Sequence, residues 1–312
     1  MTQPAIAILI VTHNSNPEIA ACLEAALRTG AEVLVIDNAS TDQTADTARA
    51  FGIRVIPNPR NVGFAAAVNQ GVRATTAPCL LLLNPDTVIQ RGVGDLAECC
   101  GEPRTGAAGG KLLTPEGVPQ TGFNVRRFPD PLVISLECLM INRIWPRNPA
   151  NWRYRCLGID LNQTQEVDQP AGAFLMFRRD VWEFVGGFDE GYFPLWFEDV
   201  DFCKRIRQAG LHVWYRPNAV AYHTGAHSIA KLSLGSRTQY WYRSLLRYSI
   251  QHFGLFGRVI TCLSVVAGAV LRIAFGGARY RSSEMLRAHY AVARLAMGSL
   301  WISKLEQGVI LQ

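Results

Sequence analysis

Residues 5–11 read AIAILIV, an uninterrupted apolar run that predicts a strand buried on both faces. Residues 16–29 follow with the spacing of a helix, and a second apolar run, residues 33–36, ends at Asp37. This order of strand, helix and strand is typical of a parallel α/β sheet. The first half of the chain therefore predicts a parallel α/β arrangement.

The same pattern continues along the chain. Residues 64–75 predict a helix, and the run CLLLL at residues 79–83 predicts a central strand. Polar residues directly follow three of the predicted strands, and in open α/β sheets ligands bind beyond the carboxyl ends of the strands. We expect a binding site at this edge, formed by Thr12-His13-Asn14, Asp37-Asn38 and Asn84-Pro85-Asp86.

Two common nucleotide-binding motifs are missing from the sequence. No GxGxxG follows the first predicted strand, and no GxxxxGK[ST] occurs anywhere. The dinucleotide-binding and P-loop classes therefore lose their main support. A nucleotide, if one binds, is held in another way.

An acidic segment among aromatic residues, GGFDEGYFPLWFEDVDFCKR at residues 186–205, is the strongest chemical signal. A carboxylate beside apolar rings is poorly solvated, so its pKa rises toward the range of a general base. Asp199 is the candidate base. The alternative is structural, because Glu198, Asp199 and Asp201 also suit the N-terminus of a helix, which Gly210 is placed to end.

Charge is spread unevenly along the chain, whose formal net charge is +6. Residues 231–312 hold 11 Lys and Arg against 2 Asp and Glu, whereas residues 1–230 hold 20 against 23. A basic tail indicates an anionic partner such as a membrane surface. Nucleic acid is the other candidate, but no nucleic-acid motif occurs, so we expect none to bind.

Two features of the tail bear on a membrane. The apolar run between Arg258 and Arg272 has 13 residues, short of the roughly 20 needed to cross a bilayer, so an interfacial or buried helix is expected. Residues 240–242 (YWY), followed by Arg243 and Arg247, resemble an interfacial anchor. The alternatives for this segment are core packing and a dimer interface.

The cysteines and the N-terminus indicate a cytoplasmic protein. Eight cysteines contain no CxxC pair, and Cys99 adjoins Cys100, which is a poor element of a disulfide framework. The N-terminus lacks the basic start and cleavage site of a signal peptide, so we expect no export. The Arg- and Pro-rich stretch from Arg126 to Arg155 has no clear period, and no structure is predicted for residues 123–165.

Eight motifs in order resemble family 2 glycosyltransferases, over about residues 5–227. They are VTHN, VIDNAST, NVGFAAAVNQG, LLLNPDT, GAFLMFRR, GGFDEGYF, FEDVDFCKR and AYHTG. The NPD in place of the family's DxD is similar to the rhamnosyltransferase-like members. The resemblance implies a GT-A fold of the α/β class, a Rossmann-like mixed sheet flanked by helices, with a C-terminal helical extension.

The resemblance also implies a domain organisation. A catalytic domain is expected over residues 1–230, with a donor half of about 1–110 and an acceptor half of about 111–230. Residues 231–312 are the basic, apolar helical extension. The implied donor-binding residues are Thr12, His13, Asn14, Asp37, Asn38, Asn61, Gly63, Asn69, Asn84 and Asp86.

Several of these roles have competing interpretations. Asp37 matches the residue that contacts the pyrimidine base, but it also suits a turn or helix cap. Asn84 replaces a carboxylate of the DxD motif, so it contacts ribose or water, or simply forms an Asn-Pro turn. Asp86 and His223 are the implied ligands of Mn²⁺ or Mg²⁺, with His227 as a weaker second histidine.

On the acceptor side, the resemblance implies that Asp199 takes the proton of the acceptor hydroxyl and that Glu198 orients the acceptor or the base. Gly172 is expected to leave space for the acceptor. Trp196 is expected to contact a sugar and Phe197 to pack in the core. Asp201 is expected to point away from the site.

The resulting prediction is an inverting, metal-dependent glycosyltransferase for cell-surface polysaccharide at the inner face of the membrane. The expected donor is dTDP-L-rhamnose or a related nucleotide sugar, and the acceptor is lipid-linked or polysaccharide. Peripheral membrane contact through the tail and a homo-oligomer are compatible with the sequence. The alternatives are a sugar nucleotidyltransferase, which would carry a Gly-rich basic loop after the first strand, and a nucleic-acid binder.

Overall fold

The computed structural model describes residues 5–225, 231–280 and 283–300. The chain divides into two compact units. The first contains residues 1–127, 155–190 and 198–228, and the second contains residues 128–154, 191–197 and 229–312. The second unit thus includes an internal segment and a loop besides the tail.

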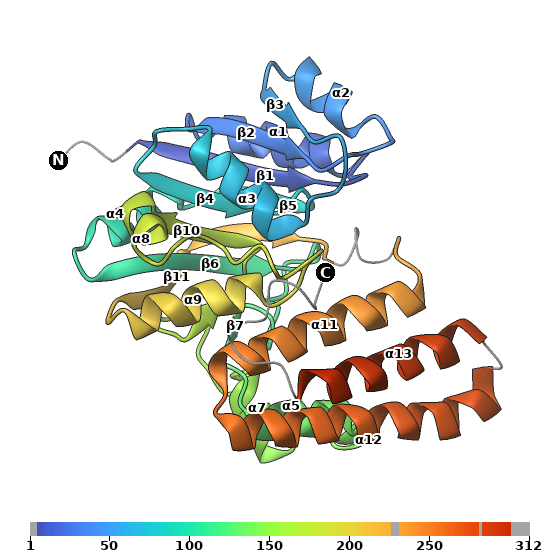
Figure 1. The fold of residues 1–312 in the computed structure, drawn as a ribbon. Helices are drawn as coiled ribbons and strands as arrows, with labels where there is room; N and C mark the ends of the chain where they lie inside the picture. The colour runs from blue at the N-terminus through green and yellow to red at the C-terminus, as the bar shows by residue number, and fades with distance from the viewer. Residues whose placement is uncertain (1–4, 226–230, 281–282, 301–312) are drawn as a thin grey trace. The chain divides into compact units, whose positions relative to one another are not determined.

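A mixed sheet forms the first unit, with strand order β3-β2-β1-β4-β10-β6-β11-β5 and β8 beside β11 (Figure 1). Strands β3, β2, β1 and β4 run parallel, β10 is antiparallel to β4 and β6, and β5 is antiparallel to β11. The predicted mixed sheet is confirmed. The strands are β1 (Ile6–Thr12), β2 (Glu32–Asp37), β3 (Arg54–Pro57), β4 (Cys79–Leu83), β5 (Thr87–Arg91), β6 (Thr105–Leu113), β8 (Gln165–Glu166), β10 (Phe174–Arg178) and β11 (His212–His223).

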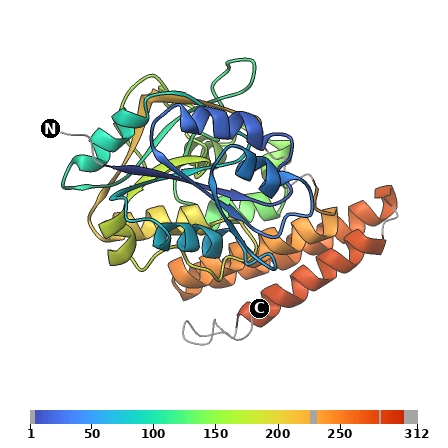
Figure 2. The same cartoon turned by 90° about the horizontal axis from the view of Figure 1, so that it is seen from above.

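Helices cover both faces of this sheet, with α1 on one face and α3 and α9 on the other (Figures 1 and 2). Because the central strands are buried on both faces, their residues alternate between two apolar layers, and α1 packs on the layer that holds Ile8, Ile10 and Leu81. A two-stranded ladder joins β7 (Val125–Arg126) to β9 (Gln169–Pro170). The helices are α1 (Ile19–Leu27), α2 (Thr44–Ala50), α3 (Phe64–Arg73), α4 (Val93–Gly101), α8 (Arg179–Phe184) and α9 (Glu198–Gln208).

Strand β5 and helix α4 have no counterpart in the sequence prediction. The link between them is Gly92, whose φ of +84° is in the left-handed region that favours glycine. A Cβ at Gly92 would lie 2.4 Å from the Ala219 Cα of β11, so only glycine allows this close approach. The pairing of β5 with β11 depends on this distant contact and not on a local apolar pattern.

The second unit is helical. Asp130 begins α5 by accepting a hydrogen bond from the Val133 N–H at 2.9 Å, and Pro131 occupies the first turn. Its core gathers side chains from α5, α11, α12 and α13, including Cys138, Leu245 and Val265. The helices are α5 (Pro131–Cys138), α6 (Ile141–Ile144), α7 (Pro149–Tyr154), α11 (Leu234–His252), α12 (Leu255–Tyr280) and α13 (Ser283–Ser299).

The structure bears on two predictions about the tail. Tyr242 is buried in this helical core and Trp241 packs against it, so these two aromatic residues serve core packing and not an exposed anchor. The helix is longer than the predicted 13-residue apolar run, because α12 continues through both Arg258 and Arg272. By length and composition alone, its segment Leu255–Ala274 could cross a membrane.

Candidate active site

The carboxyl ends of the parallel strands meet at one edge of the sheet, as predicted. Thr12 pairs with Asp37 across β1 and β2, and Ile10 pairs with Leu83, the residue before Asn84, across β1 and β4. The Thr12 hydroxyl donates to Asp37 Oδ1 at 2.9 Å in a buried contact. This end of the Asp37 carboxylate is therefore fixed by its own sheet.

Amide side chains shape the loop beside Asp37. Asn38 Nδ2 donates to Asn61 Oδ1 at 2.9 Å, and the Gly63 N–H donates to the same oxygen at 2.9 Å. Gly63, with a φ of +89°, then leads into α3. The predicted donor residues Asn38, Asn61 and Gly63 thus lie together and hold one loop.

His13 and Asn14, which follow β1, are hydrogen-bonded to the residues that follow β2. The His13 ring nitrogen Nδ1 contacts the Asn38 carbonyl oxygen at 2.8 Å, and because a carbonyl only accepts, Nδ1 is the protonated nitrogen. Asn14 has a φ of +54°, and its Oδ1 accepts from the Thr41 N–H at 2.7 Å. Both residues therefore hold the edge in shape.

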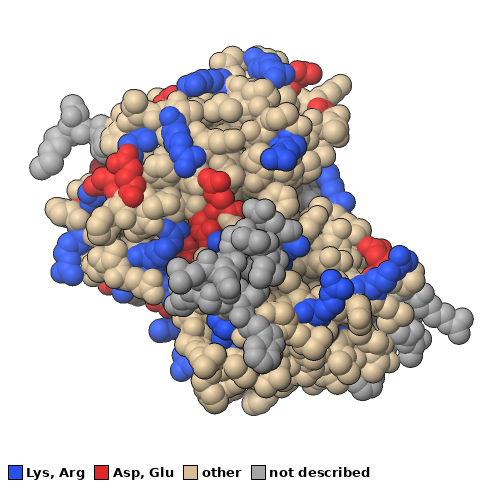
Figure 3. Space-filling view, in the orientation of Figure 1, with Lys and Arg blue, Asp and Glu red and all other residues tan. Residues whose placement is uncertain are grey.

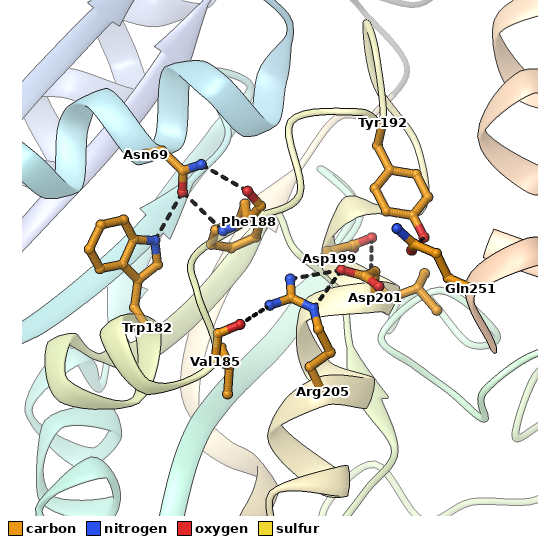
Figure 4. Close-up of polar contacts among 10 residues, drawn as sticks. Asn69, Trp182, Val185, Phe188, Tyr192, Asp199, Asp201, Arg205 and Gln251 are labelled. Atoms are coloured by element: carbon orange, nitrogen blue, oxygen red, sulfur yellow. Dashed lines mark hydrogen bonds and ion pairs between the residues drawn. The ribbon is translucent and has the colours of Figure 1, made fainter. Parts of the chain in front are cut away.

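Asn69 is fully occupied within the protein (Figure 4). Its Nδ2 donates to the Phe188 carbonyl and to Glu190, and its Oδ1 accepts from Trp182 Nε1 and the Phe188 N–H, at 2.8 to 3.0 Å. These four bonds use the whole capacity of the amide. Asn69 fixes the turn before the acidic segment, so the proposed donor site does not include it.

Asp86 and His223 lie side by side at the end of β4 and β11. His223 pairs with Thr87 across β11 and β5, and the Thr224 N–H donates to the Asp86 carbonyl at 3.2 Å. His223 Nε2 is 3.5 Å from Asp86 Oδ1, and both side chains are almost buried. Burial lowers the pKa of His223, although the Asp86 charge opposes this, and the lowered pKa favours the neutral imidazole that can act as a ligand. The other candidate, His227, lies outside the described residues.

Gln120 fixes the orientation of this histidine. Gln120 Nε2 donates to the His223 carbonyl at 2.6 Å, which leaves Gln120 Oε1 facing His223 Nδ1 at 3.0 Å. The amide oxygen only accepts, so Nδ1 carries the proton and Nε2 presents a lone pair toward Asp86. Phe123 stacks on the ring with centroids 5.2 Å apart.

When His223 is neutral, Asp86 and His223 turn two electron-pair donors toward each other, an arrangement that a cation stabilises. Within the described ranges, no three His, Cys, Asp or Glu residues gather into a possible metal site. The pair fits a metal that takes its other ligands from a bound phosphate or water. Asn84, which precedes them, has no side-chain hydrogen bond to any described residue, so its amide is available to a ligand.

Asp199, at the start of α9, is held against the first residues leading into β10. The Gly172 N–H donates to Asp199 Oδ2 at 3.2 Å, and Gln169 Nε2 donates to it at 3.3 Å. The next residue, Ala173, accepts a hydrogen bond from the Asn84 N–H through its carbonyl oxygen at 3.1 Å. The backbone just before β10, at Gly172 and Ala173, thus links the candidate base to Asn84, which follows β4.

Position 172 requires glycine for a physical reason different from the predicted one. A Cβ at this position would lie 2.8 Å from Asp199 Oδ2 and 3.0 Å from Asp199 Cβ. The space that glycine leaves is filled by the Asp199 side chain itself. Gly172 therefore lets the carboxylate approach the backbone and accept its N–H.

The two neighbouring carboxyls, Glu198 and Asp199, differ in their surroundings. Desolvation and the Asp199 charge raise the pKa of Glu198 well above its usual value, and its Oε2 has no hydrogen-bond partner among the described residues. Burial also raises the pKa of Asp199, but hydrogen bonds from Val200 and Gly172 and the Arg126 charge oppose this. Of the two carboxyls, Asp199 is therefore the one that ionises first.

Asp201 forms an ion pair with Arg205 (Figure 4). Arg205 NH2 lies 2.7 Å from Asp201 Oδ2, and Arg205 NH1 donates to the Val185 carbonyl at 2.6 Å. Asp201 therefore secures α9. The helix ends before Gly210, whose φ is +78°, as the sequence predicts.

Two aromatic residues directly precede Glu198 in the chain and belong to the second unit. The Phe197 ring lies 5.5 Å from Tyr248 and 6.2 Å from Trp241, which matches the predicted core packing. Trp196 is partly exposed and, like Phe197, has a positive φ, which is uncommon for a bulky residue. The sugar contact predicted for Trp196 stays a prediction.

Sequence reasoning missed three residues that act on the site. Gln120, Gln169 and Arg126 fall in or beside the stretch without a clear period, and each reaches its partner only after folding. Their sole signal in the sequence is the presence of polar side chains near short strands. Spacing along the chain does not connect Gln120 with His223, 103 positions away.

Known proteins resemble the chain over most of its length. A family model described as glycosyl transferase family 2 matches residues 7–185, and one described as the N-terminal domain of galactosyltransferase matches residues 158–227. The N-acetylglucosaminyl-diphospho-decaprenol L-rhamnosyltransferase of Mycobacterium tuberculosis is 30% identical over 278 residues, covering 78% of this chain and 88% of that protein. The rhamnosyltransferase WbbL of Escherichia coli is 37% identical over 83 residues, covering 26% and 30%.

Solved structures share the fold. The mannosyltransferase PcManGT of Pyrobaculum calidifontis, in complex with GDP-Man and Mn²⁺, matches with a TM-score of 0.54 at 16% identity, covering 96% of this chain and 88% of that one. GalNAc-T7 with UDP, GalNAc and Mn²⁺ matches with a TM-score of 0.64 at 14% identity, covering 95% and 56%. At these identities the likeness establishes the fold alone.

Proposed function

The chain belongs to glycosyl transferase family 2 and has the GT-A fold, and we propose that it is an inverting enzyme that transfers a sugar from a nucleoside diphosphate to an acceptor hydroxyl. The main support for the proposal is that the candidate metal ligands and the candidate base lie at the same edge of the sheet. Asp86 and His223 face each other at 3.5 Å, and Asp199 is tied to the same edge through Gly172.

In the proposed reaction, Asp86 and His223 hold a divalent cation, Mn²⁺ or Mg²⁺, with the donor diphosphate. When bound, such a cation offsets the charge of the departing diphosphate. Asn38 and Asn61 shape the loop beside the donor, and the free amide of Asn84 is available to the donor's ribose.

Asp199 acts as the general base in this proposal. It takes the proton of the acceptor hydroxyl while that oxygen forms a bond to the anomeric carbon and the bond to the diphosphate breaks. Attack from the face opposite the leaving group inverts the configuration. Glu198, protonated beside it, leaves Asp199 as the charged member of the pair.

The proposed substrates follow from the relative with the printed name of an L-rhamnosyltransferase. The donor is dTDP-L-rhamnose or a related nucleotide sugar. The acceptor is lipid-linked or polysaccharide, since the printed name of that relative specifies N-acetylglucosaminyl-diphospho-decaprenol. Because a lipid-linked acceptor for cell-surface glycan is held in the membrane, the proposed enzyme is cytoplasmic and in peripheral contact with that membrane.

A donor screen tests the proposed reaction. Purified protein with Mn²⁺ and a short-chain N-acetylglucosaminyl diphosphate lipid is incubated separately with dTDP-L-rhamnose, UDP-N-acetylglucosamine and GDP-mannose. We expect acceptor-dependent release of dTDP at least about tenfold faster than release of UDP or GDP, which corresponds to about 1.4 kcal/mol of discrimination. Absence of release from all three donors would count against the proposal, and a faster reaction with another donor would reassign the sugar.

A further inference from the structure

Helix α12 turns its apolar side outward. Phe256, Leu263 and Val270, spaced two helical turns apart, are 79%, 57% and 56% exposed. Ala267 and Ala274 are exposed on the same stripe. The stripe extends about 27 Å along the helix at 1.5 Å per residue.

Arg258 and Arg272, the two arginines of α12 whose side chains the structure describes, lie away from this stripe. Arg258 NH2 donates to the Leu300 carbonyl at 2.9 Å, and Arg272 NH1 donates to the Gly268 carbonyl at 3.1 Å and to the Cys138 carbonyl. A water-facing helix normally has charged residues outside and apolar residues inside. On α12 the packed side and the exposed stripe are both apolar, which indicates that the outer face is covered by something apolar.

We propose that this stripe of α12, Phe256 to Ala274, lies in the boundary between the headgroups and acyl chains of an anionic bilayer. This inference rests on the membrane contact in the proposed function. It assigns that contact to the stripe of α12 and not to the aromatic residues 240–242. The opposite side of α12 packs in the helical core, with Cys262 and Val265 buried there. A helix with one packed side lies along the membrane and does not cross it.

Charge favours a bilayer with anionic lipid. The unit that contains α12 holds 14 Lys and Arg against 4 Asp and Glu. Helix α13, packed beside α12, exposes Tyr290 and Met297 together with Arg287 and Arg294, the combination of apolar and basic residues typical of interfacial helices. In Figure 3 the surface over α12 is mostly uncharged, with basic side chains elsewhere on the same unit.

Vesicle sedimentation of the full chain tests the inference. The variant carries Phe256→Ser, Leu263→Ser and Val270→Ser, and the control carries Phe184→Ser, since Phe184 is 75% exposed on α8 of the other unit. With phosphatidylcholine vesicles containing one third phosphatidylglycerol, we expect the triple variant to partition at least about tenfold more weakly than wild type. The control should bind within twofold of wild type.

Two further measurements separate the alternatives. Arg287→Glu with Arg294→Glu should weaken binding to the anionic vesicles and leave the weaker binding to pure phosphatidylcholine unchanged. Unchanged partitioning of the triple variant, with its circular dichroism and melting temperature retained, would overturn the inference. A wild-type dimer that the triple variant converts to a monomer would also overturn it and assign the stripe to a second copy. Release of dTDP with a soluble acceptor tests the reaction independently.

A second, independent observation concerns Gln120. We infer that Gln120 is a positioning residue that holds His223 in the tautomer with a free Nε2 lone pair. Its backbone is fixed because the Gln120 N–H donates to the Leu112 carbonyl at 3.1 Å, next to the strand that ends at His223. The side chain then makes two bonds to His223, which admit one orientation of the amide and one tautomer of the ring.

Two readouts test this role without turnover. In ¹⁵N-histidine NMR spectra of the metal-free protein at pH 7.5, His223 should be the Nδ1–H tautomer in wild type and lose that preference in Gln120→Leu. Mn²⁺ affinity with dTDP, followed by electron paramagnetic resonance, should fall about ten- to a hundredfold. Gln163→Leu, at an exposed glutamine, is the control. An Nε2–H tautomer in wild type, or Mn²⁺ affinity within twofold in Gln120→Leu, would refute the role.

Discussion

Replacing Asp199 with asparagine is expected to lower kcat by about 10²- to 10⁴-fold, the usual contribution of a general base. The amide has nearly the same shape and can still accept the Gly172 N–H, but it cannot take a proton. Donor affinity should change little, because Asp86 and His223 are untouched. Steady-state release of dTDP with acceptor present, together with calorimetric donor binding, measures both quantities.

Asp201→Asn provides a matched control two positions along the same helix. This change weakens the ion pair with Arg205, so we expect a lower melting temperature and turnover within about threefold of wild type per folded molecule. Turnover of Asp199→Asn within threefold of wild type would contradict the role of Asp199. Equal losses in both variants would indicate that the segment is only structural.

The pH dependence follows from the same residue. Burial raises the pKa of Asp199, and a base works only when deprotonated, so activity is lost as pH falls through the raised pKa. We expect the acid limb of kcat/KM above the ordinary aspartate value of about 3.9. A profile that stays flat down to pH 4 would exclude Asp199 as the titrating base.

Replacing Asp86 with asparagine is expected to weaken Mn²⁺-dependent binding of dTDP by at least about a hundredfold. The amide removes the negative charge, and its N–H can donate to His223 Nε2, 3.5 Å from the present carboxylate oxygen. That hydrogen bond satisfies the lone pair without a cation. Isothermal titration of dTDP with and without Mn²⁺ measures the loss.

The metal dependence of the loss identifies its cause. Binding of dTDP without Mn²⁺ should be similar in wild type and Asp86→Asn, because the amide network beside Asp37 is intact. Asp46→Asn, at an exposed carboxylate on α2, should match wild type in both conditions. Tight Mn²⁺-dependent binding in Asp86→Asn would refute the ligand assignment.

Local pattern predicts the parallel half of the sheet because burial on both faces leaves long apolar runs. The run at residues 79–83 coincides with β4, and residues 5–11 differ from β1 by one residue at each end. Strand β5 (TVIQR) carries no such run, since it pairs at the sheet edge with β11. Its existence depends on Gly92 and on a strand more than a hundred residues away.

The site shows the same limit. Asp86 and His223 each follow an apolar strand, so the sequence marks them, and the fold brings them together. Gln120 has no such marker, because its role arises from a loop returning to β11. The residues Trp241 and Tyr242 illustrate the converse error: aromatic rings beside arginines suit a membrane surface and a helical core equally, and only packing decides.

The anomeric configuration of the product tests the central claim most directly. Proton NMR of the glycan formed from dTDP-L-rhamnose should show a linkage with the configuration opposite to that of the donor, because one displacement assisted by Asp199 inverts the anomeric carbon. A product that retains the donor's configuration would contradict the single displacement and the role assigned to Asp199.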